Sequence, residues 1–295
     1  MARRLSTDGA DFETAFAALL ALKREQAVDV EDAVREIVKD VRVRGDAALI
    51  DYTKRFDKLD LRPDAIRLAA DEIDAAVERA GEDNLHALRF AAERIEAHHR
   101  RQLPADDRYT DSCGAEIGHR WTAIEAVGLY VPGGQGSYPS SMLMNAIPAK
   151  VAGVPRIAMC VPASGGEINP LVLAAAKLAG VDEIYPVGGA QAIAALAYGT
   201  ETIKPVAKIM GPGNAYVAAA KRQVFGTVGI DMIAGPSEVL IVADNSGDPQ
   251  WIAADLLAQS EHDEAAQAIL ITDDAAFAAA VEAAVTQQLA RLPRA

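Results

Sequence analysis

Gln259 and His262 stand three residues apart, at the end of an apolar stretch that runs from Trp251 to Leu257. Residues with this spacing share one face of a helix, so both side chains can reach a single metal ion. Zinc takes about four protein or water ligands, and no His or Cys follows His262. The pair indicates part of a metal site, unless both residues only form the solvated end of a helix.

Three glycine-rich turns each follow an expected strand and precede an expected helix, at residues 128–141, 187–191 and 211–216. Glycine lets backbone N–H groups approach an anion closely, and the start of a helix adds a favourable dipole. We therefore consider these turns candidates for contact with a phosphate or a dinucleotide. The alternative is that the glycines only tighten the connections.

One polar or aromatic residue in each turn is a candidate ligand contact: Tyr130, Gln191 and Asn214. Each also has a purely structural explanation, as a buried strand aromatic, a polar helix start and a helix N-cap, respectively. The usual dinucleotide fingerprint is incomplete, because Tyr216 occupies the position of the third glycine in Gly-x-Gly-x-x-Gly. A fourth turn contains Ser237, which lacks the Gly-x-Ser-x-Gly context of a nucleophile and is expected to line a pocket.

The elements that must position these residues change in character along the chain. Apolar periodicity predicts helices up to about residue 103, including one that ends near Gly45. Short apolar runs then alternate with helical stretches, which is typical of a mainly parallel sheet with helices on both faces. The strands are expected at 123–131, 156–161, 183–187, 207–210, 239–243 and 268–272, and the helices at 141–154, 169–179, 190–198, 214–225 and 249–260.

The predicted fold class is α/β, with two Rossmann-like parallel-sheet lobes that lack the glycine fingerprint and are preceded by helices. We expect a discontinuous first lobe, residues 1–129 plus 238–295, because the expected strand at 239 needs neighbours. Residues 130–237 would form the second lobe. Ligands of such sheets bind at the carboxyl ends of the strands, where the glycine-rich turns lie.

Composition narrows the class of protein. A hydrophobic content of 51% with 24% charged residues is typical of a globular chain. A formal net charge of −13 argues against nucleic-acid binding and against an anionic membrane surface. Two cysteines, Cys113 and Cys160, are too few for a disulfide framework, so a reduced, cytoplasmic setting is expected.

Several long segments, in order, resemble the histidinol dehydrogenase family. They are GLYVPGG at 128–134, YPSSMLMNAIPAKVAGV at 138–154, EIYPVGGAQAIAALAYGTETI at 183–203, KIMGPGNAYVAAAK at 208–221, IDMIAGPSEVL at 230–240 and AADLLAQSEHD at 253–263. The resemblance implies a homodimeric enzyme that uses zinc and two molecules of NAD to oxidise L-histidinol to L-histidine through the aldehyde, the last step of histidine biosynthesis.

The same resemblance implies roles for individual residues. Tyr130, Gln191 and Asn214 would contact NAD. Ser237 would contact the substrate, and Gln259 and His262 would bind zinc and, through it, the substrate.

Family members are longer by well over a hundred residues. The resemblance places their remaining zinc ligands, an Asp and a His, and a catalytic Glu-His pair in that additional part. We therefore expect this chain to be an amino-terminal portion that is inactive alone and contains no catalytic acid or base. Two alternatives are a related NAD-dependent dehydrogenase of another small polar alcohol and a non-catalytic fragment that keeps dinucleotide binding.

Overall fold

The computed structural model describes residues 3–133, 138–235, 237–261 and 266–292. The chain divides into two compact units, and the smaller one is discontinuous. The larger unit is Gln26–Ala234, and the smaller unit combines Met1–Glu25 with Gly235–Ala295. The unit boundary at residue 25 falls within the first helix, α1 (Phe12–Arg44).

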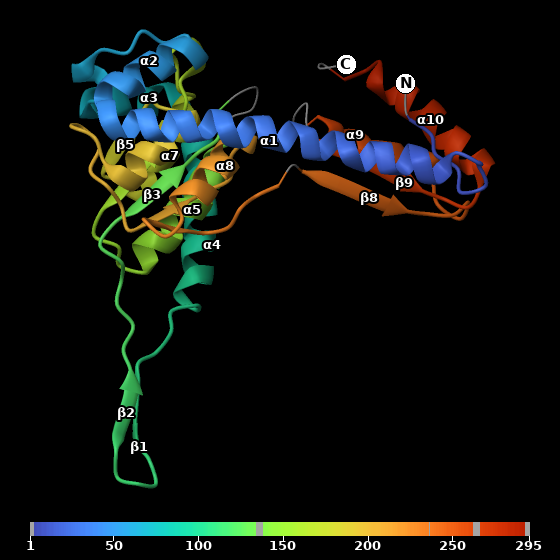
Figure 1. Cartoon of the computed structure of the whole chain (residues 1–295). Coiled ribbons are helices and arrows are strands. Elements are labelled where there is room, and N and C mark those ends of the chain that lie inside the picture. The colour runs from blue at the N-terminus through green and yellow to red at the C-terminus, as the bar shows by residue number, and fades with distance from the viewer. Residues whose placement is uncertain (1–2, 134–137, 236, 262–265, 293–295) are drawn as a thin grey trace. The chain divides into compact units, whose positions relative to one another are not determined.

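A five-stranded parallel sheet forms the centre of the larger unit (Figure 1). Its order is β5-β4-β3-β6-β7, so the chain moves to one side from β3 to β5 and then crosses to the other side of β3. Such a reversal makes a crevice at the carboxyl ends of the two strands that flank it, here β3 and β6. The strands are β3 (Val127–Tyr130), β4 (Ile157–Cys160), β5 (Glu183–Tyr185), β6 (Lys208–Met210) and β7 (Gly229–Ile230).

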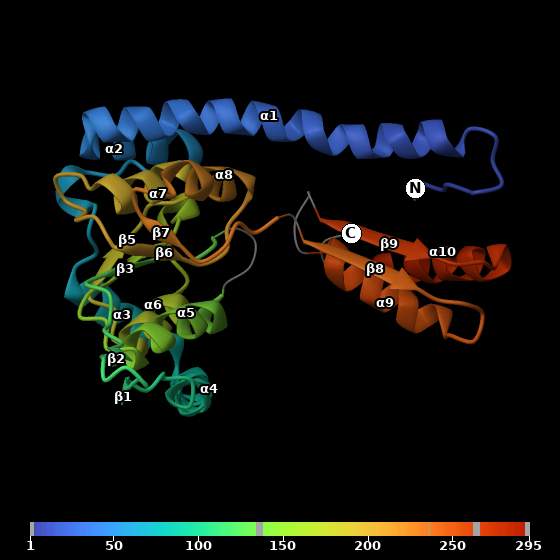
Figure 2. The same cartoon turned by 60° about the horizontal axis from the view of Figure 1, so that its bottom comes forward.

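Helices cover both faces of this sheet (Figure 2). One layer contains α3 (Ala70–Ala80), α4 (Glu82–Arg100), α5 (Pro139–Val151) and α6 (Pro170–Ala179). The other contains α2 (Asp46–Phe56), α7 (Gly189–Tyr198), α8 (Ala215–Val224) and the second half of α1. Two 3-10 turns, η1 (Pro63–Ala65) and η2 (Ser164–Gly166), lie in the connections.

Alternation along β3 assigns its side chains to the two cores. Val127 and Leu129 pack in the core on the α5 and α6 side, whereas Tyr130 packs in the core on the α7 and α8 side. Successive side chains of a strand point to opposite faces. Tyr130 is therefore directed towards α7, the helix that begins in the second glycine-rich turn.

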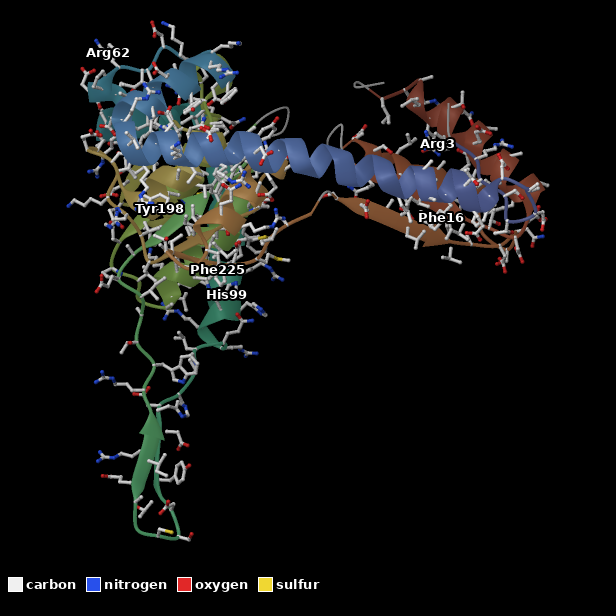
Figure 3. The ribbon with its side chains drawn as sticks, in the orientation of Figure 1. Arg3, Phe16, Arg62, His99, Tyr198 and Phe225 are labelled. Carbon is white, nitrogen blue, oxygen red and sulfur yellow. The ribbon has the colours of Figure 1, made fainter. Side chains whose placement is uncertain are left out.

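A hairpin made of β1 (Asp107–Thr110) and β2 (Glu116–His119) pairs only with itself among the described strands. Every residue of both strands is exposed, and their side chains point away from the ribbon (Figure 3). Apolar periodicity in the sequence does not reveal this hairpin, because a hairpin without a buried face has no apolar alternation.

The smaller unit contains a two-stranded parallel sheet of β8 (Glu238–Val242) and β9 (Gln267–Ile271). α9 (Pro249–Ser260) and α10 (Ala275–Leu289) pack on it around Leu256, Phe277 and Val281. The Asp274 carboxylate caps α10 by accepting hydrogen bonds from two backbone N–H groups.

The predicted α/β class with parallel sheets is confirmed, and each of the six expected strands is present within a few residues. The units differ from the expected lobes in one respect: residues 26–129 pack with the five-stranded sheet rather than with the carboxyl-terminal segment. The reason is that β3 is an inner strand of that sheet, and α1 to α4 supply apolar side chains to its two cores. In the part of the chain that is described, no helix is long and apolar enough to cross a membrane.

Candidate functional site

Tyr130 ends β3 with its ring buried and its phenol engaged by the next glycine-rich turn. Its side chain is 3% exposed. The backbone N–H of Gly189, at the start of α7, donates a hydrogen bond of 3.1 Å to the phenol oxygen. Burial raises the pKa of the phenol well above its ordinary value, so the group stays protonated near neutral pH. The turns after β3 and β5 are thereby joined at the carboxyl edge of the sheet.

Gln191 lies in the first turn of α7 and is 1% exposed. Neither its amide nitrogen nor its amide oxygen has a hydrogen-bond partner among the residues that the structure describes. A buried polar group without a partner costs on the order of 1–3 kcal/mol. A polar ligand that binds at the carboxyl edge of the parallel sheet could supply the missing hydrogen bonds of this amide.

Asn214 caps α8, as the structural interpretation predicted. Its side-chain oxygen accepts hydrogen bonds of 3.1 Å from the backbone N–H groups of Tyr216 and Val217. The residue is exposed, so its amide nitrogen is accessible at the start of the helix. Capping occupies the oxygen and leaves the nitrogen as the group that can donate to a ligand.

Lys221 and Asp231 fix the turn that leads to Asn214. The Lys221 ammonium, on a residue that is 2% exposed, pairs with the Asp231 carboxylate and donates a 2.9 Å hydrogen bond to the Gly211 carbonyl. The other Asp231 oxygen accepts from the Gly211 N–H at 2.8 Å. Both backbone groups of Gly211 are therefore held by one ion pair.

Gly211 needs to be glycine. Its φ of +111° lies outside the range that other residues adopt readily, and a Cβ there would collide with the carbonyl of Tyr130. The backbones of the turns after β3 and β6 consequently approach each other closely, at the point where the strand order reverses. The structure thus brings the turns of Tyr130, Gln191 and Asn214 to one edge of the sheet.

The other predicted residues belong to the smaller unit. Ser237 is half-buried and precedes β8, and its carbonyl accepts a hydrogen bond from the Gln267 N–H. Gln259 is half-buried in the last turn of α9. His262 lies outside the described residues, as do residues 134–137 of the first glycine-rich turn.

A zinc site cannot be assembled from the donors that are described. No group of three or more His, Cys, Asp or Glu side chains in the described ranges is arranged to hold a metal ion. Gln259 alone offers one neutral amide oxygen, which is a weak ligand for zinc. The donors in the described ranges therefore do not fit a zinc ion.

Sequence reasoning missed Lys221 and Asp231. Each lies inside a motif that was identified, but their pairing requires α8 to fold back along β6 and β7. Lys221 stands four and three residues after Val217 and Ala218 and so shares their apolar helix face, which was the available signal. A buried lysine needs a charged partner.

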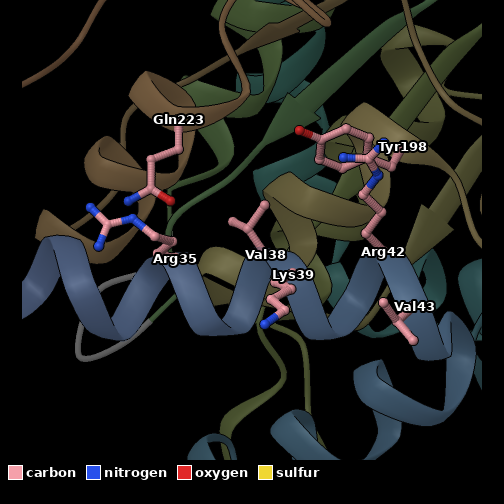
Figure 4. Close-up of a pocket in the computed structure, with 7 residues that line it drawn as sticks. All are labelled: Arg35, Val38, Lys39, Arg42, Val43, Tyr198 and Gln223. Atoms are coloured by element: carbon pink, nitrogen blue, oxygen red, sulfur yellow. The ribbon is translucent and has the colours of Figure 1, made fainter.

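A shallow groove runs along α1 in the larger unit but contains none of the predicted residues (Figure 4). It encloses about 590 Å³ and is lined by Arg35, Val38, Lys39, Arg42, Val43, Tyr198 and Gln223. Arg42 lies over the ring of Tyr198, 5.0 Å from its centre, and Arg35 pairs with Asp32. These cations are already engaged in local contacts, so the groove is not assigned to the site.

Comparison with known proteins identifies the family. The protein-family model described as Histidinol dehydrogenase matches residues 21–295. The chain belongs to the histidinol dehydrogenase family. The resemblance inferred from the motifs is thus confirmed, together with the oxidoreductase class that it implies.

Two relatives named histidinol dehydrogenase illustrate the match. The protein from Rhizobium meliloti (strain 1021) is 69% identical over 295 residues, which is all of this chain and 68% of that protein. The protein from Brucella suis biovar 1 is 70% identical over 96% of this chain and 66% of its own length. The chain spans about two thirds of the length of these curated relatives.

A solved structure supports the fold. The crystal structure of histidinol dehydrogenase from Elizabethkingia anophelis superposes with a TM-score of 0.78 at 42% sequence identity. The match covers 90% of this chain and 61% of that one. The α/β architecture described above is therefore that of the family.

Proposed function

We propose that this chain supplies the NAD-binding part of an enzyme that oxidises L-histidinol to L-histidine through the aldehyde. Family membership supports the substrate, because the relatives at 65–70% identity are named for it. The observation that carries cofactor binding is the buried, unpaired Gln191 amide at the carboxyl edge of the parallel sheet.

The residues of this edge fit a dinucleotide. NAD, when bound, would supply the hydride acceptor. The Gln191 amide would gain the hydrogen bonds that it lacks, Asn214 would donate through its free amide nitrogen, and Tyr130 would hold the Gly189 turn in place. The Lys221–Asp231 pair would hold the Gly211 turn in one conformation, so that the turn would lose little conformational entropy when NAD binds.

The remaining assignments follow from the family alone. We propose that Ser237 contacts the substrate, and that Gln259 and His262 contribute to zinc binding in the complete protein. A homodimer and a cytoplasmic location are proposed on the same basis.

Asn214 provides a test that separates cofactor binding from helix capping. Asn214→Ser keeps a good N-cap but removes the amide nitrogen, so α8 should remain stable. We expect NAD to bind this variant more weakly by about 1–3 kcal/mol, the contribution of one or two hydrogen bonds. Calorimetric titration with NAD measures the affinity, and thermal unfolding checks the fold.

Two results would contradict the proposal. Absence of NAD binding by the unmodified chain would reject the cofactor site as a whole. Unchanged affinity in Asn214→Ser would reject only the role of Asn214.

A further inference from the structure

Asp57 follows directly after α2 and begins a sharp turn. The next residue, Lys58, has a φ of +58° and is the one non-glycine residue with positive φ in the described part of the chain. The Asp57 N–H closes the helix by donating to the Thr53 carbonyl at 2.9 Å. The turn therefore fixes where the Asp57 side chain lies.

Backbone contacts bring this turn to the carboxyl edge of the sheet. The Gly165 N–H, in the segment that follows β4, donates a hydrogen bond of 3.3 Å to the Asp57 carbonyl. Pro162, in the same segment, lies so close to Gly133 and Gly188 that neither glycine has room for a Cβ. The segments after β3, β4 and β5 thus converge where Asp57 lies.

The Asp57 carboxyl group has an unused acceptor. Its Oδ2 atom is buried and has no hydrogen-bond partner within the described ranges. Burial raises the pKa of this carboxyl group above its ordinary value. Burial also raises the pKa of the Tyr130 phenol, and the nearby negative charge of Asp57 raises it further.

The buried Asp57 Oδ2 atom and the buried Gln191 amide, neither of which has a hydrogen-bond partner among the described residues, therefore lie at one edge of the sheet. An ionised carboxylate only accepts hydrogen bonds, so its partner must be a donor such as a hydroxyl group. In parallel α/β folds an acidic side chain near the strand ends commonly binds a ribose hydroxyl. Neither Tyr130 nor Asn214 supplies such an acceptor.

We propose that Asp57 accepts a hydrogen bond from a ribose hydroxyl of the dinucleotide that binds at this edge. The inference rests on the proposed function and adds a cofactor-contacting residue on α2's carboxyl end, outside the glycine-rich turns. A phosphate ester on the same hydroxyl would meet the carboxylate with like charge. Asp57 would then also select against NADP if the ribose is that of adenosine.

Asp57→Asn tests the proposal, with Asp60→Asn as the matched control. Asp60 lies three residues on, pairs with Lys54 at 2.9 Å and is exposed. We expect the dissociation constant of the 295-residue chain for NAD to rise about tenfold in Asp57→Asn, the usual effect of losing a hydrogen bond to a charged group. Asp60→Asn should leave the constant unchanged.

Thermal unfolding excludes a structural explanation. The raised pKa means that ionised Asp57 opposes folding at neutral pH, so removing the charge should not lower the melting temperature. A fall in both melting temperature and NAD affinity would instead assign Asp57 a purely structural role and overturn the proposal.

Titration with NADP identifies the ribose. Stronger NADP binding by Asp57→Asn than by the unmodified chain would support contact with the adenosine ribose. A parallel loss for NAD and NADP would support contact with the nicotinamide ribose. Unchanged NAD affinity in Asp57→Asn, alongside a loss in Asn214→Ser, would overturn this proposal and leave the proposed function intact, whereas no NAD binding by the unmodified chain would overturn both.

Discussion

At the scale of single residues, Gln191 shows a conflict between stability and binding. Its amide is buried without partners, which a protein tolerates where a ligand completes the hydrogen bonds. Gln191→Leu removes the unpaired atoms and keeps a side chain of similar size. We expect the free energy of unfolding to increase by about 1 kcal/mol in the absence of ligand while NAD binding weakens at least tenfold. Denaturant unfolding and calorimetric titration measure the two effects.

Gln223 provides the matched control for this exchange. Its side-chain nitrogen donates hydrogen bonds of 2.9 Å to the carbonyl and the carboxylate of Glu31, far along α8 from the glycine-rich turns. Gln223→Leu should therefore lower stability and leave NAD binding unchanged. A lower stability in Gln191→Leu would mean that the Gln191 amide has a structural partner, and would remove the main support for the cofactor site.

At the scale of elements, the Lys221–Asp231 pair connects α8, β6 and the segment after β7. Burial raises the pKa of Asp231, but hydrogen bonds from Lys221 and from the Gly211 and Met232 N–H groups outweigh it and hold the pKa below its ordinary value of 3.8. A carboxylate with a lowered pKa stabilises the fold above its ordinary pKa, and this stabilisation is lost as the pH falls through the lowered value.

Lys221→Met and Asp231→Asn test this connection. Asp231→Asn should lower the free energy of unfolding at pH 7 by about 3 kcal/mol, because it leaves the buried Lys221 ammonium unpaired. Lys221→Met should lower it by less, because the Asp231 carboxylate is only partly buried. The double variant should lose less than the sum of the two. The difference in the free energy of unfolding between the unmodified chain and Asp231→Asn should become smaller when denaturant unfolding is repeated below pH 3.8. An additive double variant with no pH dependence would show that the pair is not coupled.

The elements themselves were largely predictable, because buried parallel strands appear as short apolar runs bounded by glycine. The turns of Tyr130, Gln191 and Asn214 followed from the same rule, since parallel strands place their carboxyl ends at one edge. Asp57 and Lys221 were not predictable in this way. Asp57 lies beside the segments that follow β3, β4 and β5, and Lys221 pairs with Asp231 on another element. Local periodicity encodes neither arrangement.

At the scale of the whole molecule, the candidate residues are divided between the two units. Tyr130, Gln191 and Asn214 belong to the larger unit, and Ser237 and Gln259 belong to the smaller one. The matched relatives also contain about a third of their length outside the region shared with this chain. On the proposed function, we therefore expect cofactor binding to depend on the larger unit and oxidation to require groups in addition to it.

We expect the 295-residue chain to bind NAD but to form no NADH when L-histidinol is added, because a hydride transfer from an alcohol requires a base that takes its proton. A chimera that joins this chain to the unmatched part of the Rhizobium meliloti relative should restore NADH formation, since the shared parts are 69% identical. In that chimera, His262→Ala should reduce both bound zinc and turnover but leave NAD affinity unchanged. Absorbance at the NADH band, metal analysis and NAD titration of the three proteins provide the measurements. Histidinol-dependent turnover by the 295-residue chain alone would show that every catalytic group lies within this sequence.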